Sequence, residues 1–115
     1  MNAQPQTERA FRARAGAGPV LTIVEAVASE TALTTACILG PRRTNDIALA
    51  RQIAMHVARK RLRWSYPRIG HVIGRDHSTV QHGAGVIAMR LNHDEELREL
   101  VARIEGRLEQ QEGAA

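Results

Sequence analysis

The stretch PRIGHVIGRDHSTV, from Pro67 to Val80, decides how this chain of 115 residues can fold. It opens with an apolar triple at helical spacing (Ile69, Val72, Ile73), and Gly74 follows as a helix stop. After the polar run RDHST, apolar residues return at intervals of three and four: Val80, Ala84, Ile87 and Leu91. Two helices joined by a tight glycine turn are typical of a helix-turn-helix, whose second helix enters the major groove of DNA.

The turn itself indicates which side chains face outward. Asp76 suits the N-cap of the second helix, because its carboxylate is placed to accept from the amide of Ser78 or Thr79. That register points His77 and Ser78 to the outside and commits Val80 to the core. The first turn of this helix is therefore the expected reading surface.

Three separated motifs occur in a fixed order around this turn: ARQIAMHVAR at Ala50–Arg59, PRIG from Pro67 and GRDHSTV from Gly74. With them, the chain from about Leu21 to Leu108 resembles the C-terminal DNA-binding domain of the bacterial replication initiator DnaA. The resemblance implies an all-α fold, a small bundle of about five to six helices with a Trp-repressor-like helix-turn-helix. It also implies double-stranded DNA with DnaA-box-like sites as the partner.

The resemblance also implies a role for individual residues. It assigns base edges in the major groove to Asp76, His77 and Ser78, and the adjacent minor groove to Arg43. Phosphate contacts fall to seven further residues: Arg42, Arg51, Gln52, Arg59, Arg75, Thr79 and His82. Arg43 lies in a basic loop, Arg42–Asn45, which is either an arm reaching the narrow minor groove or an ordinary N-cap region with two solvated arginines.

Some positions depart from the family pattern. The turn before Arg75 is one residue shorter than usual, and Ser78 replaces the more common Thr, which removes a methyl group. Gly83 and Gly85 lie inside the second helix, where each costs roughly 0.5–1 kcal/mol relative to Ala. Gly85-Val86 also stands where relatives often carry a basic pair. These departures concern affinity and the preferred target sequence.

The formal charge of +4 is unevenly distributed along the chain. Residues 41–76 hold nine Lys or Arg against two acids, a balance of +7. Residues 77–115 hold four Arg against seven acids, a balance of −3. A basic middle third around a helix-turn-helix is the expected footprint of a phosphate-binding surface, whereas a solvated face without a ligand is the alternative.

The remaining segments are expected to support this corner. Residues 1–18 are interpreted as a disordered basic, Ala/Gly-rich tail, and residues 19–111 as the DNA-binding domain. The longest predicted helix, Asp46 to about Leu62, has a buried stripe and places Arg51, Gln52 and Arg59 on the other side. The stripe consists of Ile47, Ala50, Ala54, Val57 and Ala58. The acidic segment Asn92–Glu109 is predicted to be a helix away from DNA, either a brace or a surface for a protein partner.

Several function classes find no support in the sequence. The single cysteine, Cys37, excludes an intramolecular disulfide, and with no signal-peptide core or membrane-length apolar run the expected location is the cytoplasm, at the nucleoid. No G-x-x-x-x-G-K-[ST] motif occurs, so no nucleotide and no ATPase activity are expected. The five histidines lack metal-site spacing, and Ser78 beside His77 lacks an orienting group. We therefore expect no metal, no cofactor and no enzymatic activity.

The sequence thus favours a free-standing module that binds DnaA-box-like sites and regulates replication initiation or transcription without an ATPase. Two alternatives remain open. One is a non-specific nucleoid DNA binder. The other is a protein-interaction module that uses the acidic C-terminal helix, with DNA binding relaxed.

Overall fold

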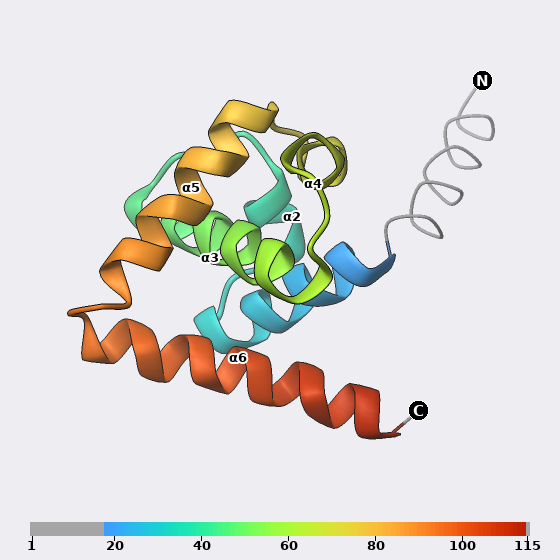
Figure 1. The fold of residues 1–115 in the computed structure, drawn as a ribbon, viewed down its shortest axis with the longest axis vertical. Coiled ribbons are helices and arrows are strands. Elements are labelled where there is room, and N and C mark those ends of the chain that lie inside the picture. Colours follow the sequence, from blue (N-terminus) through green and yellow to red (C-terminus); the bar gives the residue numbers. More distant parts are fainter. Residues whose placement is uncertain (1–17, 115) are drawn as a thin grey trace.

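In the computed structural model, which describes residues 18–114, every regular element is a helix (Figure 1). The helices cover residues 18–31, then Thr35–Leu39 (α2), Asn45–Leu62 (α3), Tyr66–Ile73 (α4), His77–Arg90 (α5) and Glu95–Ala114 (α6). This confirms the predicted all-α bundle with a helix-turn-helix formed by α4 and α5. Residues 1–17, which make up most of the predicted tail, lie outside the described range, and the domain limits stay a prediction. No helix between residues 18 and 114 is long and apolar enough to cross a membrane.

The helices of the motif begin and end where local side-chain chemistry requires. The Ser65 hydroxyl accepts from the Arg68 amide at 3.2 Å, and an Asp76 carboxylate oxygen accepts from the Thr79 amide at 2.8 Å. The Asp76 N-cap was predicted from sequence and is confirmed. Gly74 ends α4 in the left-handed region with φ +82°, which a residue with a Cβ rarely adopts.

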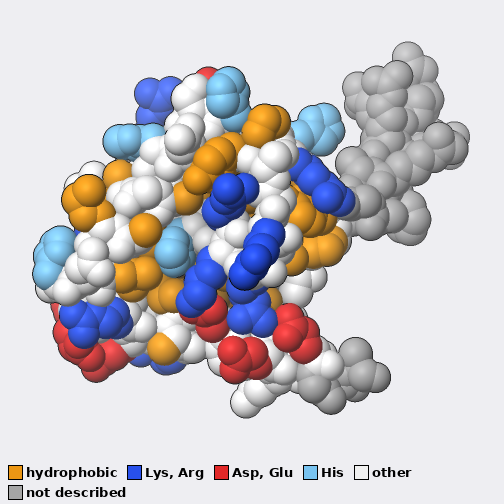
Figure 2. All heavy atoms as spheres, in the orientation of Figure 1, with side chains coloured by type: hydrophobic (Ala, Val, Ile, Leu, Met, Phe, Trp, Pro, Cys, Tyr) orange, Lys and Arg blue, Asp and Glu red, His pale blue; other side chains and the backbone are white. Residues whose placement is uncertain are grey.

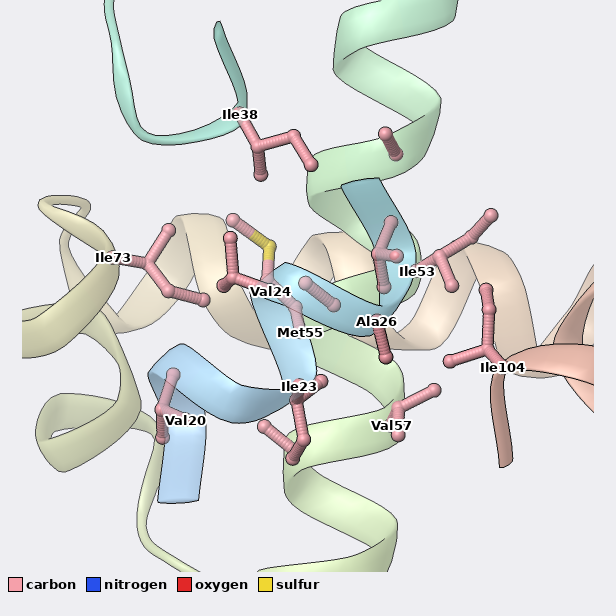
Figure 3. Close-up of a cluster of buried hydrophobic side chains, with 14 of the residues drawn as sticks. Val20, Ile23, Val24, Ala26, Ile38, Ile53, Met55, Val57, Ile73 and Ile104 are labelled. Carbon is pink, nitrogen blue, oxygen red and sulfur yellow. The ribbon is translucent and has the colours of Figure 1, made fainter. Parts of the chain in front are cut away.

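The core is aliphatic and is organised around α3. Figure 3 shows buried side chains of the N-terminal helix, α2, α4 and α6 around α3, which itself supplies Ile53, Met55 and Val57. The five predicted stripe residues of α3 are all buried: Ile47, Ala50, Ala54, Val57 and Ala58. Apolar burial contributes about 25 cal/mol per Å², so a core without large aromatics needs many such side chains in close packing.

Gly83 shows how closely α5 approaches α3. A Cβ on Gly83 would lie 2.6 Å from the Met55 Sδ and 3.2 Å from the Gln52 Cγ. The same addition at Gly85 would meet nothing within 4 Å. Both glycines lower the helix propensity of α5 equally. Only at Gly83 would a side chain collide with another helix, because only Gly83 faces α3.

The acidic helix α6 lies on the opposite side of the molecule from the α4–α5 turn, as predicted (Figure 1). It is attached at two places by ion pairs. Lys60 and Arg61 at the end of α3 contact Glu105, and Arg61 also reaches Glu109 and Glu112. A second group joins Arg103 and Arg107 to Glu30 of the N-terminal helix. In Figure 2, basic side chains meet acidic ones along the edge of α6.

Candidate nucleic-acid interface

The N-terminus of α5 presents the predicted reading residues to solvent. His77 is the first residue of α5, and His77, Ser78 and Thr79 are exposed. Val80 is fully buried, which confirms the predicted register of the helix. Asp76, also exposed, uses one carboxylate oxygen for the cap and leaves the second outside that bond. The start of α5 therefore offers both acceptor and donor groups for base edges.

Hydrogen bonding holds the Asp76 carboxyl in its charged form. The Thr79 amide and hydroxyl lower the pKa of Asp76 below its ordinary value, with a smaller contribution from the neighbouring His77. Near neutral pH the carboxylate is an acceptor only, so it suits a base amino group rather than a base carbonyl.

A close backbone contact determines the shape of the α4–α5 turn. The carbonyl of Gly70 accepts from the amides of Gly74 at 2.7 Å and Arg75 at 2.9 Å. A Cβ on Gly70 would lie 2.1 Å from the Arg75 carbonyl oxygen, so no side chain fits there. The sequence interpretation gave Gly70 no role of its own. A glycine inside a predicted helix, four residues before another glycine, was the available signal.

A hollow of about 630 Å³ lies between the loop after α2, the middle of α3 and the start of α5. Six of the predicted DNA-contacting residues line it: Arg43, Arg51, Gln52, Arg75, Thr79 and His82. Its twelve lining residues, taken from the described part of the chain, include no Asp or Glu. The positive charge around this hollow is thus not neutralised from within, which favours occupation by an anionic group.

Arg51 does not lie on the exposed side of α3, and that prediction was wrong. Arg51 is only 6% exposed, because position 51 comes four residues after Ile47 and three before Ala54 and so falls within the apolar stripe. The buried guanidinium donates to main-chain carbonyls: Nε to Ile38 at 2.7 Å, and Nη2 to Arg42 at 2.9 Å and Gly40 at 3.0 Å. Burial lowers the pKa of Arg51, and the positive charges of Arg75 and Arg43 lower it further.

Arg75 is half-buried beside it. Its Nη2 donates to the Gly40 carbonyl at 2.7 Å and its Nη1 to the Gly74 carbonyl at 3.1 Å. The Gly40 carbonyl therefore accepts from two arginines, one on α3 and one in the α4–α5 turn. This arrangement was not predicted, since main-chain acceptors in a loop leave no mark on the sequence.

The basic residues near the end of α3 fall into two groups. Arg59 is exposed, and its guanidinium donates to the Trp64 carbonyl at 2.8 Å and stacks 4.4 Å from the centre of the Tyr66 ring. Arg68 of α4 stacks 3.5 Å from the Trp64 ring and is an exposed cation that sequence reasoning overlooked. Lys60 and Arg61, by contrast, are paired with the acids of α6. Arg59 does not line the hollow.

Comparison with known proteins gives one family. Residues 20–87 match a family model described as bacterial dnaA protein helix-turn-helix. The chain is 40% identical over 73 residues to a chromosomal replication initiator protein, DnaA 2, from Protochlamydia amoebophila, covering 64% of this chain and 16% of that protein. It is 37% identical over 106 residues to the Streptococcus agalactiae initiator protein DnaA, covering 86% and 23%. For the protein of the same name from Thermomicrobium roseum, 87 residues are 39% identical, covering 75% and 19%. The match therefore spans less than a quarter of the length of these relatives.

Proposed function

This chain belongs to the bacterial DnaA helix-turn-helix family, and on that premise we propose that it binds double-stranded DNA at DnaA-box-like sequences. The observation that carries the proposal is the joint position of two groups. The exposed start of α5 presents its N-cap Asp76 together with His77 and Ser78, and the basic hollow beside it is bordered by Arg43. Bases are read by the first group in the major groove and by Arg43 in the adjacent minor groove.

Phosphates are held around these base contacts. The residues proposed for this role are Arg42, Gln52, Arg59, Arg75, Thr79 and His82. Arg51 is left out of this group, because its guanidinium is turned inward to main-chain carbonyls. Phosphate contacts fix the register of the protein on the duplex, while the few base contacts supply specificity. With about six phosphates engaged, log K falls with log salt at a slope of roughly −5.

The biological consequence follows from occupancy. A protein seated on a box excludes other proteins from it, so the proposed role is non-catalytic regulation of replication initiation or of transcription at the nucleoid. The relatives are named as chromosomal replication initiator proteins, which is why initiation is the first process to examine.

Fluorescence anisotropy at about 0.15 M salt tests the proposal. The protein is titrated into a labelled duplex carrying a DnaA box and into a scrambled duplex of equal length. We expect a preference for the box, which His77→Ala reduces by about 5- to 150-fold, the range of one good base contact. His93→Ala is the matched control, because His93 is also exposed but lies in the turn between α5 and α6.

Two outcomes contradict the proposal in different ways. Equal affinity for both duplexes indicates a non-specific nucleoid binder that uses only the basic surface. No affinity for either duplex, with an intact helical circular dichroism spectrum, indicates an interaction module that acts through α6. A box preference that survives His77→Ala refutes the assignment of the reading residue.

A further inference from the structure

Arg51 is the one charged residue that is buried among residues 18–114. Burying a guanidinium is unfavourable unless its donors are satisfied, and here they are directed at the carbonyls of residues 37, 38, 40 and 42. These carbonyls come from the end of α2 and from the loop that carries Arg42 and Arg43. Arg51 therefore fixes the main chain on which the proposed minor-groove arm is built.

The same loop is held from its other side. Arg75, next to the N-cap of α5, donates to the Gly40 carbonyl at 2.7 Å, while Arg51 reaches that oxygen at 3.0 Å. Residues 41–44 are exposed and belong to no helix, so side chains rather than packing hold them in place. The Gly40 carbonyl is thus the point where α3, the loop and the α4–α5 turn are tied together.

Two guanidinium groups that bind the same carbonyl repel each other. One arginine or one neutral donor would be enough to hold the loop against α3, so the second arginine needs another explanation. The second arginine links the loop to the turn that leads into α5, so that Arg43 and His77 become parts of one rigid unit. A fixed spacing between them matters only if both contact the same ligand at once.

We propose that Arg51 and Arg75 are positioning residues that hold the Arg43 loop at a fixed distance from the start of α5 and so set the spacing between the minor-groove and major-groove contacts. The inference rests on the proposed function. It predicts that Arg51 contributes to minor-groove discrimination without contacting DNA, and that its effect disappears once Arg43 is absent. Replacing Arg51 by lysine keeps the charge but removes the planar fork that reaches several carbonyls.

A base-pair substitution isolates the minor-groove contact. Guanine·cytosine differs from inosine·cytosine by one amino group in the minor groove, while the two pairs present the same major-groove edge. Each pair replaces the A·T base pair of the box at which the wild-type protein discriminates through Arg43. Wild type is expected to prefer inosine·cytosine by at least about fivefold, the lower end of one good base contact. Arg43→Ala abolishes that preference, and Arg51→Lys is expected to reduce it to below about twofold.

The double variant Arg43→Ala/Arg51→Lys decides between positioning and direct contact. We expect it to bind the box no more weakly than Arg43→Ala alone, because Arg51 acts through Arg43. If the double variant loses as much binding free energy as the two single variants together, the inference is overturned. Major-groove discrimination, measured by mutating a base pair read by His77, is expected to stay within about twofold of wild type in Arg51→Lys. Equal loss in both grooves indicates general destabilisation and also overturns the inference.

A measurement without DNA separates this inference from the proposed function. In backbone ¹⁵N relaxation, the order parameters of Arg42, Arg43 and Thr44 are expected near 0.85 in wild type and below about 0.6 in Arg51→Lys. Wild-type values in the variant contradict the inference whatever the protein binds. Wild-type protein that binds box and scrambled DNA equally contradicts the proposed function instead. If Arg51→Lys does not fold, the order parameters of the same three residues are measured without DNA in Arg75→Lys, which loses the second tie to the Gly40 carbonyl; wild-type values there contradict the inference.

Discussion

The two glycines of α5 give a prediction whose sign differs between neighbouring positions. Gly85→Ala adds a methyl group to the exposed face of the helix, where nothing lies within 4 Å. Gly83→Ala adds the same group against α3, at 2.6 Å from the Met55 Sδ and 3.2 Å from the Gln52 Cγ. The two variants have the same composition and change the same helix, so each serves as the control of the other.

The magnitudes follow from two opposing effects. Replacing glycine by alanine in a helix stabilises the folded state by roughly 0.5–1 kcal/mol, because the unfolded chain loses conformational freedom. Gly85→Ala is expected to gain this amount in full. For Gly83→Ala, displacing Met55 and Gln52 costs about 1–3 kcal/mol, so the net change in the free energy of unfolding is a loss of up to roughly 2.5 kcal/mol.

Urea unfolding followed by circular dichroism at 222 nm measures both variants. With an m-value of about 1–3 kcal/mol/M, Gly85→Ala raises the midpoint by roughly 0.2–1 M, and Gly83→Ala lowers it. The reasoning is refuted if the two variants shift the midpoint by the same amount, since α5 then does not lie against α3 at Gly83. A Gly85→Ala midpoint below that of wild type also refutes it.

Three further changes test other parts of the structure. Gly70→Ala places a Cβ 2.1 Å from the Arg75 carbonyl oxygen, so we expect a loss of about 1–3 kcal/mol in thermal unfolding, whereas Gly106→Ala, with open space around it, is stabilising. Burial and the charge of Lys60 lower the pKa of His56 below its usual 6.5, and its Nε2 has no partner among the described residues. As the pH falls below 6.5, His56 is therefore protonated in the unfolded chain before it is protonated in the folded protein, and the free energy of unfolding falls. In His56→Gln, the free energies of unfolding from urea titrations at pH 7 and pH 5 should differ less than in wild type. Hydrogen bonds from the Leu97 amide and then from Arg90 lower the pKa of Asp94 below 3.8. The charged carboxylate therefore stabilises the folded state above that pH, and this stabilisation is lost as the pH falls further. Asp94→Asn should flatten acid unfolding between pH 5 and pH 2.5, and an unchanged profile contradicts this account.

Most of the fold was predictable because the helix signals are local. The apolar spacing in Pro67–Val80, the cap at Asp76 and the stop at Gly74 all act over a few residues, and each agrees with the structure. The exposure of His77 and the burial of Val80 followed from the same register. Nothing in these inferences required knowledge of a distant segment.

The parts that escaped prediction depend on contacts between distant residues. Arg51 was predicted to lie on the side of its helix opposite the buried stripe, although its position within the apolar spacing was already readable from the sequence. Its partners are main-chain carbonyls 9 to 14 residues away, which no side-chain pattern marks. The cations at the end of α3 were counted toward the DNA-binding charge, but Lys60 and Arg61 are neutralised by α6, whose acids lie more than 40 residues further along the chain.

The placement of α6 has a consequence for how the protein meets DNA. With basic groups around the α5 start and acidic groups on the far side, the molecule carries an electric dipole between these two faces (Figure 1). A polyanion turns such a dipole before contact, so most encounters begin with the reading face forward. The Debye length is about 10 Å at 0.1 M salt and about 30 Å at 0.01 M, so this torque acts from afar only in dilute salt. Lowering the ionic strength should therefore raise the association rate constant more than it lowers the dissociation rate constant.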